Sequence, residues 1–238
     1  MPRALLWPTL WSAFGFILLL GLGTWQVERL QWKLGLIAVR EAGIHAAPTA
    51  LPVTLGDARS LEFHPVRAEG RFLNERELYL VAPSLRGDAG YHVITPLLLE
   101  SGATLLVDRG FVPTDRKAPT TRAAGEPQGL VTVTGLLRLP VAGKPSWFTP
   151  DNDPARNQWF YWDLDAMTSA AKLDRVVPFY IEANASPNPG GSPEGGQTVT
   201  ELPNNHLQYA ITWYALAVAL LAIYIRFARR RLAETRGE

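Results

Sequence analysis

Cysteine is absent from this 238-residue chain, and methionine occurs only twice. Without thiolates the chain forms no disulfide, no CxxC redox pair, no thiolate zinc site and no covalent c-type haem attachment. The formal charge is only +1, from 23 basic and 22 acidic residues, so no broad positive field attracts nucleic acid. The GxxxxGK[ST], GxSxG and HExxH patterns are also missing. These absences argue against a nucleic-acid-binding protein, a thiol copper carrier and an enzyme.

Two long apolar runs lie near the ends of the chain. No charged residue stands between Arg3 and Glu28, which leaves 24 uncharged positions, and the run 207–225 has 19 residues. About 20 apolar residues cross a bilayer as a helix. The bulky and charged sequence after the first run is unlike a signal-peptide cleavage site, so we expect an uncleaved anchor. We predict transmembrane helices over 4–27 and 206–226.

Basic residues set the expected orientation of these spans. Five arginines stand in 226–238, and Arg3 precedes the first run. Lys and Arg beside a span stay on the cytoplasmic side. We therefore predict a multi-pass protein of a bacterial inner (plasma) membrane, with both termini cytoplasmic and 227–238 as a basic tail. The segment 28–205 is the expected periplasmic domain; its 17 basic and 20 acidic residues give a net charge of −3, which is compatible with export.

Small residues follow a helical spacing in the second run, at Ala215, Ala219 and Ala222. Such a spacing lets another helix approach closely. The alternative is that these alanines simply face lipid. The sequence does not decide whether the two helices touch.

The middle segment consists of short runs of strand-forming residues separated by turn residues. The runs are 65–72, 77–81, 90–99, 103–112, 129–139 and 176–183. Asp163 is a good N-cap for a helix over 164–173. The predicted fold class is a membrane protein with two transmembrane α-helices flanking an extracytoplasmic, β-rich α+β domain, an antiparallel barrel or sandwich.

A histidine stands where this domain meets the second apolar run. His206, Tyr209 and Trp213 share one helical face, and Trp25 and Arg29 share a face at the exit of the first run. Neutral imidazole is a good axial ligand for haem iron, aromatic side chains flank an apolar macrocycle, and an arginine pairs with propionates. The alternative is an interfacial histidine bonded to a nearby loop, within a belt of aromatic residues.

Sequence blocks along nearly the whole chain resemble those of one family. In order they are GLGTWQVERLQWKLGLI (21–37), PVRAEGRF with ELYL, GYHVITPL, LLVDRGFVP (105–113), PDNDPARNQWFYWDLDAM (150–167), GGQT (195–198) and NNHLQYAITWYALA (204–217). Together they resemble the Surfeit locus protein 1 family, assembly factors of haem–copper cytochrome c oxidase. Gln158 and Phe160 stand where some relatives have histidines, so we assign no ligand there.

The resemblance implies a non-enzymatic assembly factor in the membrane lipid, which binds haem a. It implies that haem a made by haem A synthase is held here and assisted into oxidase subunit I. His206 corresponds to the family histidine proposed as the axial ligand of the haem iron, and Trp25, Arg29, Tyr209 and Trp213 stand at family-typical positions beside it. The competing hypothesis is a scaffold that stabilises nascent subunit I and binds no haem.

Overall fold

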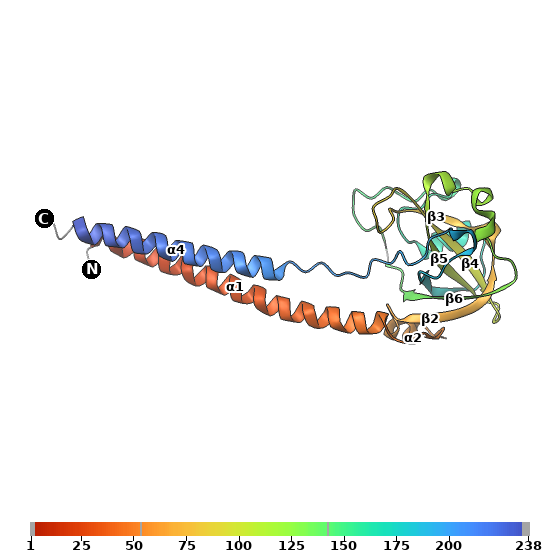
Figure 1. The fold of residues 1–238 in the computed structure, drawn as a ribbon, viewed down its shortest axis with the longest axis horizontal. Coiled ribbons are helices and arrows are strands. Elements are labelled where there is room, and N and C mark those ends of the chain that lie inside the picture. The colour runs from red at the N-terminus through yellow and green to blue at the C-terminus, as the bar shows by residue number, and fades with distance from the viewer. Residues whose placement is uncertain (1–2, 53, 142, 235–238) are drawn as a thin grey trace. The chain divides into compact units, whose positions relative to one another are not determined.

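The computed structural model describes residues 3–52, 54–141 and 143–234 (Figure 1). The α-helices are α1 (Arg3–Ile44), α2 (Leu55–Ser60), α3 (Leu164–Ala170) and α4 (His206–Glu234). The strands are β1 (Thr49–Ala50), β2 (Pro65–Phe72), β3 (Leu78–Val81), β4 (Gly90–Leu99), β5 (Thr104–Pro113), β6 (Leu130–Arg138) and β7 (Val176–Ala183). The chain divides into a helical unit, within Met1–Val39 and Glu201–Glu238, and a β unit, Arg40–Thr200.

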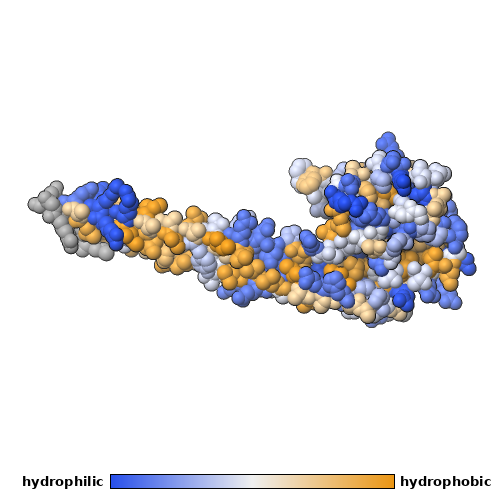
Figure 2. Space-filling model, viewed as in Figure 1, coloured by the Kyte–Doolittle hydropathy of each residue, from blue (hydrophilic) through white to orange (hydrophobic). Residues whose placement is uncertain are grey.

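The helical unit consists of most of α1 together with α4. Both helices are long and apolar enough to cross a membrane, by length and composition. At 1.5 Å per residue the 42 residues of α1 measure about 63 Å, roughly twice a bilayer's hydrocarbon thickness. Many large apolar side chains of both helices are exposed, and Figure 2 shows apolar surface over much of the helical unit. The predicted ends of the two membrane spans, at residues 27 and 226, mark a membrane surface and stay predictions. The helices themselves continue unbroken past these residues.

The β unit is a barrel-like sheet of seven strands. Their order is β1-β2-β6-β7-β5-β4-β3, and β2 also pairs with β4. This additional pairing, which joins Gly70–Phe72 to Leu97–Leu99, closes β2, β6, β7, β5 and β4 into a ring. Closure protects the edges that an open sheet leaves unpaired. The structure thus favours the barrel over the sandwich.

Side chains of the ring pack into two apolar clusters, one on each face of the sheet. The inner cluster includes Leu105 and Val107 of β5. The outer cluster includes Leu106 of β5 and lies under α3 and Trp159, which is fully buried. Because β5 is covered on both faces, nearly all of its residues are buried and it lacks the polar alternation of a half-exposed strand.

The predicted strands agree with the observed ones to within about a residue at each end. Asp163 caps α3 as expected, with its carboxylate accepting a hydrogen bond from the backbone N–H of Ala166 at 3.0 Å. One part of the fold prediction is wrong. The sheet is not wholly antiparallel, because β5 pairs with β7 and β1 with β2 in parallel. A parallel partner for β5 is possible since β6 and the long segment that contains α3 connect β5 to β7.

Candidate functional site

The candidate site lies at the beginning of α4. Pro203 precedes this helix, and its ring disfavours a helical conformation for the residue before it. The side-chain oxygen of Asn204 accepts a hydrogen bond from the backbone N–H of His206 at 3.4 Å, and the carbonyl of Asn205 accepts from Tyr209 at 3.2 Å. The first turn of the helix therefore holds the His206 backbone in place.

The His206 imidazole contacts a polar side chain of the other long helix. Its Nδ1 lies 2.7 Å from Oε1 of Gln26, whose side chain is buried. A carbonyl oxygen only accepts, so Nδ1 carries the proton and donates it. In the neutral ring the Nε2 lone pair is then free to bind an electrophile such as a metal. A hydrogen bond of this kind orients metal-binding histidines in proteins generally.

Close packing of the two helices brings Gln26 and His206 together. A Cβ on Gly23 would lie 2.7 Å from the ring of Tyr214, so a larger side chain does not fit there without movement. The Tyr214 hydroxyl in turn lies 3.1 Å from Oγ1 of Thr24. On α4, Ala210 and Ala217 are buried, and their spacing of seven places both on one face. Small side chains thus let the helices approach to hydrogen-bonding distance.

This contact answers the question that the alanine spacing left open. Ala215, Ala219 and Ala222 are exposed, so they are not the contact face of α4. The buried stripe, Ala210 and Ala217, lies on the opposite side of the helix, because Ala217 is two positions, or about 200°, from both Ala215 and Ala219. The alternative, in which those three alanines face the surroundings, is the observed one.

The other predicted site residues lie around this contact with more exposure. Trp25 and Tyr209 are 51% and 55% exposed, and Trp213 is half-buried. The guanidinium of Arg29 lies over the ring of Trp32, 4.2 Å from its centroid. Among the described residues, none of these side chains bonds to His206. Their roles beside His206 therefore stay predictions.

The prediction missed Gln26. A polar side chain inside an apolar helix is costly unless it is paired, so it marks the side that faces protein. Gln26 and Gly23 are three residues apart and lie on the same face of α1. That combination of an amide and a glycine on one face was the available signal.

Two other histidines, His92 and His64, have structural surroundings. His92 Nδ1 lies 2.7 Å from Asp108 Oδ2 inside the β unit. Burial lowers the pKa of His92, but the charge and hydrogen bond of Asp108, together with Glu182 and the Pro83 backbone, raise it, and the resulting pKa lies above its ordinary value. His64 Nδ1 lies 3.2 Å from the carbonyl of Glu62. Across the described ranges, no three His, Cys, Asp or Glu side chains cluster as a metal site.

The described residues thus form a barrel-like β unit and a pair of long apolar helices. The comparison with protein families matches residues 13–218 to the SURF1 family, and the chain belongs to that family. Surfeit locus protein 1 of Mus musculus is 39% identical over 226 residues, which cover 88% of this chain and 72% of the mouse protein. The Homo sapiens protein is 38% identical, covering 87% and 72%. The SURF1-like protein of Monosiga brevicollis is 40% identical, covering 89% and 83%.

Proposed function

We propose that this protein is a membrane-bound assembly factor for haem–copper cytochrome c oxidase, which holds haem a and assists its delivery to subunit I. The observation that carries the proposal is the 2.7 Å hydrogen bond from His206 Nδ1 to Gln26. It leaves the Nε2 lone pair of a half-exposed imidazole available for iron, in a chain that belongs to the SURF1 family.

The residues around His206 fit a haem by their chemistry. His206 supplies a nitrogen ligand, Trp213 and Tyr209 supply aromatic surface beside it, and Arg29 supplies a charge for a propionate. One histidine without a second protein ligand is suited to cargo that has to be released. Haem A synthase is the proposed source of the haem a, and subunit I is its proposed acceptor. Carrying haem between them requires no reaction catalysed by this chain.

The proposal places both long helices in a lipid bilayer. Their large apolar side chains face outward, where water would solvate them poorly. Arg226, Arg229 and Arg230 near the end of α4 support a cytoplasmic C-terminus. The β unit is then periplasmic in a bacterial inner membrane.

Absorption spectra of purified protein test the haem proposal. The protein is isolated from membranes of cells that make haem A synthase, in three forms: wild type, His206→Ala and Gln26→Leu. We expect haem a in the wild type, none in His206→Ala, and a reduced amount in Gln26→Leu, because the imidazole there is no longer oriented. Thr24→Val is the matched control, since it removes a hydrogen bond between the same helices without touching His206.

Two results would contradict the haem assignment. Haem retained in His206→Ala, with circular dichroism unchanged, would move the ligand elsewhere. No haem in any form, with oxidase assembly still dependent on the protein, would favour the scaffold that holds subunit I and binds no haem.

Reporter fusions test the topology separately. An alkaline phosphatase fused after residue 120 is expected to be active, because it would be exported, whereas one fused at residue 238 is expected to be inactive. The reverse pattern would contradict the proposed orientation and leave the haem question untouched.

A further inference from the structure

Exposed arginines gather near the end of α4. Arg226, Arg229 and Arg230, which we call the arginine patch, line an open hollow of about 670 Å³ together with Ala222 and Ile225. At about 100° and 1.5 Å per residue, the three arginines lie within an arc of about 100° and a length of about 6 Å. Hydrophilic surface is visible at this end of the helical unit, beside apolar surface (Figure 2). Three positive charges thus share a small area of one helix.

No carboxylate balances the arginine patch within the described part of the helical unit. Residues 3–27 contain no Asp or Glu, and Glu234 is the one acidic residue in 202–234. Its Oε2 lies 3.4 Å from Nη1 of Arg231, the residue that follows the patch. The three arginines of the patch form no ion pair with any described residue. Their guanidiniums are therefore open to an anion from outside the chain.

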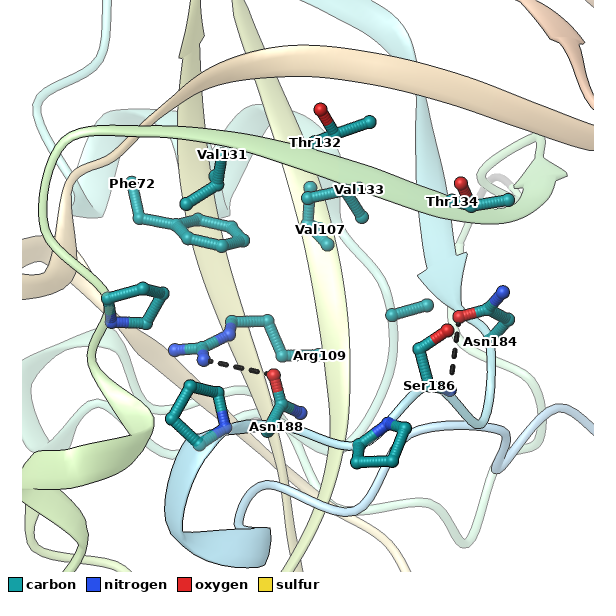
Figure 3. A pocket seen from close by; sticks show the side chains of 14 residues that line it. Phe72, Val107, Arg109, Val131, Thr132, Val133, Thr134, Asn184, Ser186 and Asn188 are labelled. Atoms are coloured by element: carbon teal, nitrogen blue, oxygen red, sulfur yellow. Dashed lines mark hydrogen bonds between the residues drawn. The ribbon is translucent and has the colours of Figure 1, made fainter.

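The charged pocket of the β unit is different in this respect. Arg109 lines a hollow there, beside Phe72 and Asn188 (Figure 3). This arginine is 2% exposed, donates to Oδ1 of Asn188 at 3.4 Å and lies 3.7 Å from the carboxylate of Glu77. The fold itself uses the charge of Arg109, whereas the arginine patch is exposed and has no such partner.

A shallow apolar groove leads from the arginine patch along α4. Its floor consists of the three exposed alanines of the second apolar run, Ala215, Ala219 and Ala222. All three lie within about 40° of the direction of Arg226 around the helix. Val218 and Ile223, which are 66% and 67% exposed, border them on the two sides. From its first alanine to Arg226 the groove is about 16 Å long, close to half the hydrocarbon thickness of a bilayer.

The groove and the arginine patch lie on the side of α4 that faces away from α1. Ala217 belongs to the buried face, and it is nine positions, or about half a turn in direction, from Arg226. In the proposed membrane this outward side meets lipid. A molecule that matches it has an anionic head at the patch and an apolar chain of about one leaflet's depth.

A phosphate is the anionic head that suits an arginine patch at a membrane surface. The planar guanidinium binds phosphate oxygens in pairs, and it is more weakly hydrated than the ammonium of lysine. Basic residues immediately beside a membrane span attract acidic lipid headgroups. The head and the chain together describe an acidic phospholipid.

We propose that the arginine patch binds the phosphate head of an acidic phospholipid of the cytoplasmic leaflet, with one acyl chain in the alanine groove. The proposal rests on the membrane placement proposed above and does not depend on haem. Three positive charges exceed the charge of one phosphodiester. A lipid with two phosphates, cardiolipin, is therefore expected to bind more tightly than phosphatidylglycerol, which has one.

Native mass spectrometry of the full chain in a non-ionic detergent tests the proposal. The probes are cardiolipin, phosphatidylglycerol and the zwitterionic phosphatidylcholine, all with the same acyl chains. We expect cardiolipin to bind the wild type at least about tenfold more tightly than phosphatidylcholine, with phosphatidylglycerol between them. Inorganic phosphate at the same concentration is expected not to displace the lipid. Displacement would indicate a site for free phosphate and overturn the lipid assignment.

Two triple variants with the same loss of charge separate the patch from general effects. The patch variant carries Arg226→Gln, Arg229→Gln and Arg230→Gln. The control changes three exposed arginines of the β unit that have no ion pair, as Arg59→Gln, Arg67→Gln and Arg71→Gln. We expect the dissociation constant for cardiolipin to rise about 10- to 100-fold in the patch variant and to stay within about twofold in the control.

A second pair of variants tests the position of the acyl chain. Ala219→Trp fills the groove, whereas Leu216→Trp places the same ring on an exposed position about a quarter turn from the groove. We expect cardiolipin to bind about 3- to 10-fold more weakly to Ala219→Trp and within about twofold of wild type to Leu216→Trp. Equal binding by these two variants would overturn the groove as the place of the chain.

The proposal as a whole is overturned if the wild type binds phosphatidylcholine as tightly as cardiolipin. It is also overturned if the patch variant binds cardiolipin as well as the control variant does. The arginines would then act only on the orientation of the chain in the membrane. Because lipid is added to purified protein, these results are independent of the reporter fusions and the haem spectra, which test the proposed function separately.

Discussion

The helical unit and the β unit bury opposite kinds of side chain. In the β unit most of the large buried side chains are apolar, such as Phe179, Ile181 and Trp159. In the helical unit the buried residues include Ala210, Ala217 and the amide of Gln26, while most of the large apolar side chains are exposed. The two units of this chain therefore differ in which side chains they bury and which they expose.

This difference is the one expected if the helices lie in lipid, as we propose, and the β unit lies in water. Water drives apolar side chains into the barrel, because their burial removes surface from water. Between helices in lipid that drive is missing, since lipid tails are as apolar as leucine. Close packing and hydrogen bonds hold such helices together, here from Thr9 to Tyr224 at 2.6 Å and from Gln26 to His206 at 2.7 Å. The pattern supports the proposed membrane location of the helices.

The largest expected effect comes from a buried charge in the barrel. Arg122→Met removes both hydrogen bonds to Glu77 and leaves that buried carboxylate with Arg109, 3.7 Å away, as its cationic neighbour. We expect the free energy of unfolding of the β unit to fall by about 3–5 kcal/mol, measured by urea unfolding with near-ultraviolet circular dichroism. The double variant Glu77→Gln/Arg122→Met is the control and is expected to recover part of the loss. A double variant less stable than Arg122→Met would contradict this explanation.

A helix contact is expected to give the next largest effect. Gly23→Val forces the Tyr214 ring away, whereas Gly21→Val meets nothing within 4 Å and serves as the matched control. We expect Gly23→Val to weaken helix pairing by about 1–3 kcal/mol. Because the chain has no cysteine, spin labels can be attached at Leu6→Cys and Ile225→Cys alone. Their distance distribution is expected to broaden in Gly23→Val only; equal broadening in both variants would contradict the close-packing model.

The pH dependence of the barrel is expected to be smaller. The pKa of His92 is raised in the folded state by Asp108, so its contribution is present below the ordinary histidine pKa of 6.5. It is lost as the pH rises through the folded pKa, with a slope of at most about 1.4 kcal/mol per pH unit for one proton. Urea unfolding at several pH values is expected to show this fall in wild type but not in His92→Gln. A parallel fall in His92→Gln would assign it to another group.

The helix cap gives the smallest expected effect. Asp163→Ala removes the hydrogen bond to the backbone N–H of Ala166, which we expect to lower the free energy of unfolding by about 1 kcal/mol. Asp165→Ala, in the same first turn, is the control, because Asp165 is exposed and its carboxylate makes no capping bond. Thermal unfolding of the two variants is compared directly. Equal losses would assign the effect to negative charge at the helix start rather than to the cap.

Local features of the fold were predictable from the sequence to a large degree. The strands and the Asp163 cap depend on patterns within a few residues, such as alternation and the preference for a carboxylate at a helix start. The parallel pairing of β5 with β7 was not predictable in this way. It depends on where the chain returns after α3, which no alternation pattern records.

The candidate site was predictable only in part. His206 was singled out because a histidine at the start of an apolar run is conspicuous and the family resemblance added to that signal; its role as a ligand stays a prediction. Gln26 was missed because it is 180 positions from His206 in the sequence. In the structure its Oε1 lies 2.7 Å from Nδ1 of His206. The rotation of each helix decides which of its polar residues face the partner, and that rotation is set by packing around Gly23 and Tyr214.

The sequence by itself determined the two apolar helices, the strand segments and the absence of thiol chemistry, because composition and short periodicities dictate these features. Only the tertiary structure decided that β2 pairs with β4 to close the ring, that Gln26 hydrogen-bonds His206, and that Arg122 pairs with the buried Glu77. Each of these depends on register or rotation between segments far apart in the chain. Such relations are fixed by the packing of all the side chains together, and no single stretch of sequence contains them.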